Sequence, residues 1–98
     1  MAKFGELISS EIPVLIDFYN HWDESSNNIH STLRDVAAAL GDKAKVIKID
    51  IGKNEILANA LRIKGNPTFI IYKNGEMKWR QSGKQDAKTL INLVEQYF

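Results

Sequence analysis

The sequence predicts one α/β domain over residues 1–98, with a central mixed β-sheet of about four strands and helices on both faces. Runs with helical spacing of apolar residues alternate with short runs rich in β-forming residues. A hairpin signal near the C-terminus adds an antiparallel pair of strands to an otherwise parallel pattern. A length of 98 residues with 44% hydrophobic side chains matches one compact core and leaves no room for a second.

The first two elements are expected to be a short helix and a buried strand. Apolar residues within 4–8 recur at helical spacing, and a polar stretch ends this pattern before Pro13. Residues 14–19 form a nearly continuous apolar run in which Asp17 is the one charge. Such a run is typical of a strand buried on both faces, so we expect it at the centre of the sheet.

The longest helix is expected over residues 23–40. Its apolar side chains follow helical spacing, and Gly41 stands where a left-handed C-terminal cap belongs. The acidic and serine side chains of residues 23–26 suit the free N–H groups and the positive end of the helix dipole. A second interior strand is expected at residues 45–51, where β-branched residues alternate with polar ones.

A further helix is expected over residues 54–61, capped by Asn54 and ended by the Gly-Asn-Pro sequence at 65–67. The spacing of its apolar residues predicts a buried stripe of Ile56, Leu57, Ala60 and Leu61.

The last third of the chain predicts a hairpin followed by a helix. Residues 68–72 read as a strand, and the Asn74-Gly75 dipeptide favours a type I′ turn into a returning strand at 76–82. Asp86 then opens a C-terminal helix whose apolar residues again follow helical spacing.

Charge and hydropathy exclude several classes of partner. Thirteen Lys and Arg against twelve Asp and Glu give a net charge of +1, too small for a nucleic-acid-binding surface to dominate. No apolar run reaches the roughly 18 residues of a membrane-spanning helix, and no signal-peptide pattern opens the chain. We therefore expect a cytoplasmic monomer with neither nucleic-acid nor membrane partners.

Five separate motifs occur in an order that resembles the thioredoxin family. They are residues 14–19 followed by Trp22, Lys48 within Val46-Ile47-Lys48-Ile49-Asp50, the segment 62–68 around Pro67, the turn at 73–76, and Gly83. The resemblance extends from about Phe4 to Phe98. It implies the thioredoxin fold, a buried carboxylate at Asp17 with Lys48 as its neighbour, and a cis-proline at Pro67. It also implies a groove for extended peptides around Trp22, Asn66, Pro67 and Thr68.

The redox motif of that family is missing here. Where thioredoxins carry Cys-Gly-Pro-Cys, this chain reads Asp23-Glu24-Ser25-Ser26, so Asp23 and Ser26 occupy the cysteine positions. The chain contains no cysteine at all. Dithiol exchange needs a thiolate of lowered pKa and a second, resolving thiol, and a serine hydroxyl supplies neither. The sequence therefore predicts a redox-inactive protein with no catalytic residue and no cofactor.

With the chemistry lost, Asp17 and Lys48 are interpreted as a relic buried pair. Desolvation is expected to raise the pKa of Asp17, and Lys48 is expected to oppose that rise. The surviving function implied by the resemblance is non-covalent binding of a protein or an extended peptide.

Two alternatives remain open at this point. The protein could descend from, and be described as, a thiol-disulfide oxidoreductase. It could also be an engineered or metal-binding variant that uses His21, Asp23 and Glu24, with His30 as a more distant donor. The change from the family pattern is concentrated between Asn20 and Ser31, which fits either engineering or a narrow change of use.

Overall fold

A computed structural model describes residues 4–22, 26–64 and 67–98 of the chain. The elements in order are α1 (Phe4–Ile8), β1 (Val14–Tyr19), α2 (Ser26–Leu40), a 3-10 turn (Gly41–Lys43), β2 (Lys45–Asp50), α3 (Glu55–Ala60), β3 (Thr68–Lys73), β4 (Glu76–Ser82) and α4 (Ala87–Glu95). In the described ranges, no helix has the length and apolar character needed to cross a membrane.

The four strands form one mixed sheet in the order β2-β1-β3-β4. Strand β1 pairs in parallel with β2 and antiparallel with β3, and β3 pairs antiparallel with β4. The expected mixed sheet with β1 at its centre is therefore confirmed. The expectation that residues 45–51 form an interior strand is wrong, because β2 lies at an edge of the sheet. Its alternating pattern reflects exposed lysines, Lys45 and Lys48, among half-buried residues.

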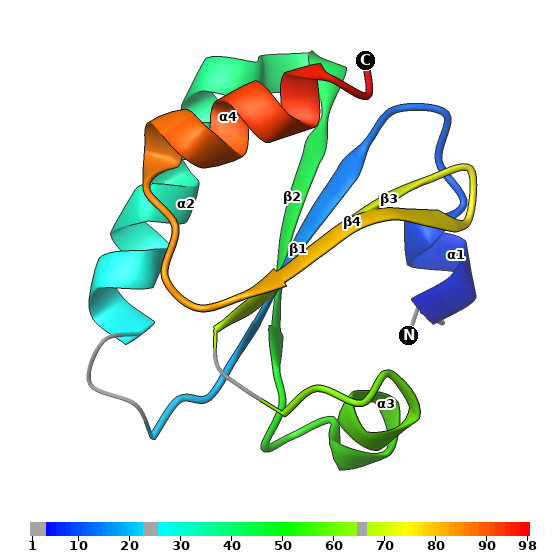
Figure 1. The fold of residues 1–98 in the computed structure, drawn as a ribbon, viewed down its shortest axis with the longest axis vertical. Coiled ribbons are helices and arrows are strands. Elements are labelled where there is room, and N and C mark those ends of the chain that lie inside the picture. Colours follow the sequence, from blue (N-terminus) through cyan, green and yellow to red (C-terminus); the bar gives the residue numbers. More distant parts are fainter. Residues whose placement is uncertain (1–3, 23–25, 65–66) are drawn as a thin grey trace.

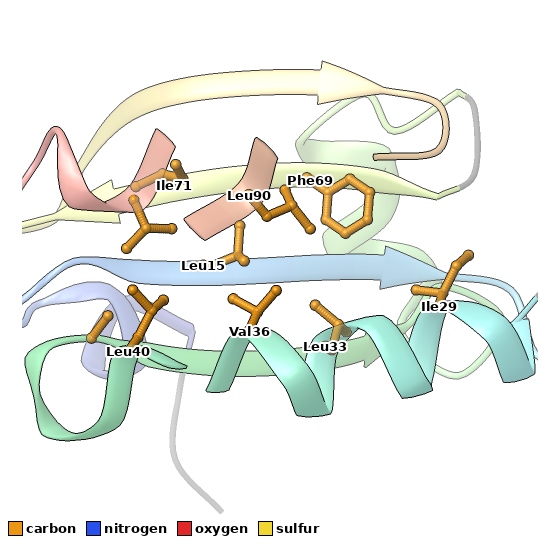
Figure 2. Close-up of a cluster of buried hydrophobic side chains, with 10 residues drawn as sticks. Leu15, Ile29, Leu33, Val36, Leu40, Phe69, Ile71 and Leu90 are labelled. Carbon is orange, nitrogen blue, oxygen red and sulfur yellow. The ribbon is translucent and has the colours of Figure 1, made fainter. Parts of the chain in front are cut away.

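Helices cover both faces of the sheet, with α2 and α4 on one side and α1 and α3 on the other (Figure 1). The alternation of side chains along β1 supplies one core on each side. Leu15 of β1 belongs to the core under α2 and α4, where Leu33, Val36 and Leu40 of α2 point toward the sheet (Figure 2). Phe18, also from β1, belongs to the core on the opposite face.

Local backbone signals explain how the elements end. Asn74 and Gly75 both have positive φ, 55° and 80°, as a type I′ hairpin turn requires. Gly41, directly after α2, has φ 56°, the left-handed conformation expected of a C-terminal cap. The Asp86 side chain accepts a hydrogen bond of 2.7 Å from the backbone N–H of Thr89, which confirms that Asp86 opens α4.

The helix expected at 54–61 is shorter in the structure, Glu55–Ala60, and it buries a different face from the one expected. Ile56, expected in its buried stripe, is 89% exposed, and Ala58 is buried in its place. Asn54 makes no side-chain cap; its Nδ2 instead donates to the carbonyl oxygen of Asp50 at 2.9 Å. A helix of six residues makes fewer than two turns, so the tight connection from β2, and not apolar spacing, sets which face it buries.

Candidate binding face

The sheet topology brings three connections to one end of the molecule. Strands β1 and β2 are parallel and end at Tyr19 and Asp50, whereas β3 runs the opposite way and begins at Thr68. The segments after β1, after β2 and before β3 therefore meet at the same edge. The resemblance placed Trp22 and Pro67 on these segments, so the fold brings the two regions to one end.

Trp22 is the most prominent side chain of this face. It is 78% exposed, although large aromatic side chains usually gain stability from burial. Its backbone N–H donates to Asn20 Oδ1 at 3.0 Å, which holds the turn after β1. Trp22 borders an open groove of about 390 Å³ that reaches across to α3. The other lining residues are Asn20, Ile51, Gly52, Glu55, Ala58, Asn59 and Ile63.

A close contact between His21 and Asp50 joins the segment after β1 to the end of β2. His21 Nδ1 lies 2.6 Å from Asp50 Oδ2, and the backbone N–H of Gly52 donates to Asp50 Oδ1 at 2.8 Å. The His21 and Trp22 rings stack loosely, with centroids 4.5 Å apart. Burial works to raise the pKa of Asp50, but the Gly52 hydrogen bond and His21 outweigh it and hold that pKa below its ordinary value.

A side chain at position 52 would crowd this arrangement. A Cβ at position 52 would lie 3.2 Å from Asp50 Oδ1 and 3.5 Å from His21 Cε1. Sequence reasoning singled out His21 only as a metal donor and did not select Asp50 as a site residue. The signal that would have found Asp50 is an acidic residue at the end of a strand, two residues before a glycine.

Pro67 and Thr68 form the other border of this end of the sheet. Pro67 is buried, and its carbonyl oxygen accepts a hydrogen bond from the Gly83 N–H at 2.9 Å. Thr68 is fully buried, and its Oγ1 lies 3.2 Å from Ser82 Oγ. The side chain of Thr68 is thus turned into the protein. Asn66 lies outside the described residues, so a cis bond before Pro67 stays a prediction.

Asp17 and Lys48 lie opposite each other in the parallel register of β1 and β2. Asp17 is fully buried, and neither of its carboxylate oxygens has a hydrogen-bond partner. Desolvation raises the pKa of Asp17 to about 7, and the positive charge of Lys48 opposes the rise. Both directions agree with the sequence-based expectation.

The geometry of the described residues gives little support to the metal-binding alternative. Asp23 and Glu24 lie outside the described residues, and the described His21 is engaged by Asp50. Over the ranges that the structure covers, no three His, Asp or Glu side chains are grouped as a metal would need. Ser26 is the first residue of α2, and Asp23 precedes the described part of that helix.

Comparison with known proteins places these features in one family. The thioredoxin family model matches residues 1–96. The chain is 42% identical over 95 residues to the chloroplastic thioredoxin Y of Oryza sativa, covering 96% of this chain and 56% of that protein. It is 29% identical over 90 residues to the thioredoxin of Rickettsia typhi, covering 92% of this chain and 86% of the other.

A solved structure of a mutant thioredoxin from Halobacterium salinarum superposes with a TM-score of 0.86 and 30% identity, covering 99% of this chain and 84% of that one. The chain spans little more than half the length of the chloroplastic relatives from Oryza sativa and Arabidopsis thaliana, 56% and 52%. The family match over nearly the whole chain, the shared four-stranded sheet and the cysteine-free sequence lead to one conclusion: this chain belongs to the thioredoxin family and lacks both cysteines of its redox motif.

Proposed function

We propose that this chain is a redox-inactive thioredoxin relative that binds a protein or an extended peptide without forming a covalent bond. The partner would contact Trp22 and the segment Asn66-Pro67-Thr68; because the Thr68 side chain is buried, Thr68 would contribute its backbone only. One observation carries the proposal: a 78% exposed tryptophan stands over an open groove in a chain that has no cysteine.

The loss of redox activity follows from the missing sulfur. Reduction of a disulfide by this family requires a thiolate that attacks one sulfur and a second thiol that releases the product. Asp23 and Ser26 stand at those positions, and neither side chain can form a mixed disulfide. A second thiol elsewhere cannot substitute, because the sequence contains none.

The groove retains what non-covalent recognition needs. Trp22, Ile51 and Ile63 offer apolar surface for a partner's side chain, and an exposed tryptophan is a common anchor of protein interfaces. The exposed side chain of Asn59 offers an amide group that suits the backbone of an extended peptide. The His21–Asp50 pair holds the Trp22 segment in place before a partner binds. Binding therefore loses less conformational entropy than it would from a mobile segment.

A disulfide-reduction assay tests the first half of the proposal. Insulin reduction by the purified chain in the presence of dithiothreitol is expected to stay at the rate of dithiothreitol alone. The double variant Asp23→Cys, Ser26→Cys is the positive control, because it restores both sulfur atoms on the same scaffold. A rate above background from the unmodified chain would rule out a redox-inactive protein.

Selection from a random peptide library tests the second half. The unmodified chain is expected to enrich a defined set of peptides, and the double variant Trp22→Ala, Pro67→Ala is expected to lose it. Phe98→Ala removes an exposed aromatic ring, 49% exposed at the C-terminus, and serves as the matched control that should retain the set. Identical enrichment by the unmodified chain and the Trp22, Pro67 variant would refute binding at this face.

Descent from thiol-disulfide oxidoreductases would account for the family match. It does not provide the activity, because the chain has no cysteine to carry electrons. The engineered and metal-binding alternatives have no observation in their favour among the described residues, since His21 already pairs with Asp50. The cytoplasmic location and the monomeric state stay predictions; the rice relative is named as a chloroplastic protein.

A further inference from the structure

We propose that a small, open surface cavity between α2 and β2, with the exposed side chains of Arg34 and Lys48 at its border, binds an oxyanion, namely inorganic phosphate or the phosphate group of a monoester. This cavity of about 140 Å³ lies apart from the Trp22 groove, and no residue lines both. Its lining residues are His30, Leu33, Arg34 and Ala37 of α2, with Val46 and Lys48 of β2. The proposal does not depend on peptide binding at Trp22.

The lining concentrates positive charge without a matching negative one. His30 and Arg34 are four residues apart on α2 and therefore lie on the same face of the helix, toward Lys48 on the neighbouring strand. Among the described residues, neither Arg34 nor Lys48 forms an ion pair with an acidic side chain. Three basic side chains around one hollow, with no acid in its lining, favour a bound anion.

A buried polar atom gives independent support. His30 Nε2 is buried and has no hydrogen-bond partner, which costs free energy unless a ligand supplies one. Tyr19 holds the His30 ring edge-on, with centroids 4.8 Å apart at 90°. Burial first, then the charges of Lys48 and Arg34, lower the pKa of His30, so these surroundings disfavour a third positive charge unless an anion balances it.

Size and charge select phosphate. The cavity is well below the roughly 300 Å³ of sites for drug-sized molecules, so it accommodates one small group. A phosphate monoester carries about −1.5 to −2 charges at neutral pH, which the two cationic side chains of Arg34 and Lys48 balance. Arg34 can bind two oxygens at once, and Lys48 adds a point charge. Asp17, also near Lys48, competes weakly for it because burial raises the pKa of Asp17 to about 7.

The test measures the pKa of His30 by NMR of its ring protons, in sodium phosphate and in sodium chloride of equal ionic strength. Phosphate that binds the protonated imidazole tenfold more tightly raises the apparent pKa by about 1 unit. The chain has two histidines, so His21 is an internal reference for non-specific effects. A saturable rise at His30 without one at His21 is the expected result. No rise at His30, or equal rises at both histidines, would overturn the proposal.

Variants and a second ligand complete the test. Arg34→Gln is expected to abolish the phosphate-dependent rise at His30, whereas Lys45→Gln, which removes an exposed cation from the same β2 strand, is expected to keep it. If both variants lose the phosphate-dependent rise in the His30 pKa to the same extent, the effect comes from the overall positive charge of the surface, and the proposed site would be refuted. O-phosphoserine distinguishes the sources: a rise with both ligands assigns the phosphate group of a larger partner, and a rise with inorganic phosphate alone assigns the free ion.

Discussion

His21 Nδ1 lies 2.6 Å from Asp50 Oδ2, so a side-chain hydrogen bond joins the segment after β1 to the end of β2. The pair fixes the residue next to Trp22, and Asp50 is itself fixed by the backbone N–H of Gly52. The exposed tryptophan therefore projects from a braced turn and not from a free loop. This support is present in a chain that has no cysteine for the turn to position.

Replacing Asp50 by Asn should destabilise the protein at pH 7 by about 1 kcal/mol. This is below the roughly 1.5–3 kcal/mol of hydrogen bonds to charged groups, because the His21 side chain is 40% exposed to solvent, which weakens the interaction. Despite the opposing effect of burial, the Gly52 hydrogen bond and His21 hold the pKa of Asp50 below its ordinary 3.8. The stability from Asp50 is therefore fully present well above pH 3.8 and is lost as the pH falls through the lower folded-state pKa.

Urea unfolding of the Asp50→Asn variant and the unmodified chain between pH 3 and 7 measures this difference. The gap between the two should narrow toward pH 3. Asp42→Asn, which removes an exposed carboxylate after α2, is the matched control and should follow the unmodified chain. An Asp50 variant as stable as the unmodified chain at pH 7 would show that the His21–Asp50 pair does not support the turn.

Replacing Asp17 by Asn should leave the fold intact and stabilise it above pH 7. Desolvation, opposed by Lys48, raises the folded-state pKa of Asp17 from 3.8 to about 7. Between these values the unfolded chain releases a proton that the folded chain keeps, so stability falls as the pH rises through this window. A difference of about 3 pKa units corresponds to about 4 kcal/mol at most, and the buried amide recovers only part of it.

Unfolding midpoints at pH 4 and pH 8 separate the contributions. We expect Asp17→Asn to change stability little at pH 4 and to raise it by about 1–3 kcal/mol at pH 8. Asp35→Asn, on the exposed side of α2, should show no such pH-dependent gain. A loss above about 2 kcal/mol at pH 8 would mean that the carboxylate makes an interaction the fold needs.

The fold was predictable because its signals are local. The apolar run at 14–19, the Asn74-Gly75 turn and the Asp86 cap each act within a few residues, and all appear in the structure. The edge position of β2 was not predictable in this way, because it depends on which strand pairs with β1. Exposure of Ile56 has a similar cause, since the path of the chain from β2 decides how α3 rests on the sheet.

Only those residues of the candidate site that belong to motifs of the family resemblance could be predicted from the sequence. Trp22 and Pro67 were selected from that resemblance, and the structure brings their segments to one end of the sheet. The His21–Asp50 pair joins residues 29 positions apart in the chain. The strand end and Gly52 could have pointed to Asp50, but no periodicity or local motif encodes its contact with His21, which forms only when β1 and β2 are paired.

Replacing Arg62 by Gly should stabilise the protein or leave it unchanged, although glycine usually destabilises. Arg62 has φ 55°, in the left-handed region that costs a residue with a Cβ about 1–2 kcal/mol. Glycine removes that cost. It also increases the entropy of the unfolded chain, which destabilises the fold by about 0.5–1 kcal/mol, so the two effects nearly cancel or leave the variant more stable. Arg80, whose guanidinium donates to the carbonyl oxygens of Leu61 and Arg62, should still hold this turn.

Lys64→Gly is the control for the Arg62 experiment. Lys64 is also exposed but does not have positive φ, so its replacement should cost about 0.5–1 kcal/mol. Urea midpoints of the two variants should therefore differ in favour of Arg62→Gly. A larger loss at Arg62 than at Lys64 would show that the Arg62 side chain makes a stabilising contact stronger than its backbone strain.

Replacing Trp22 by Ala should separate binding from stability. Trp22 is 78% exposed, so its removal should change the free energy of unfolding by less than about 0.5 kcal/mol. The same change removes the largest apolar surface of the groove and should weaken a selected peptide at least tenfold, the loss typical of an anchor residue worth more than about 1.4 kcal/mol. Trp79 is half-buried against the core under α2 and α4, so its fluorescence still reports unfolding in this variant. Unchanged peptide affinity in Trp22→Ala, with unchanged stability, would place the binding surface elsewhere on the molecule.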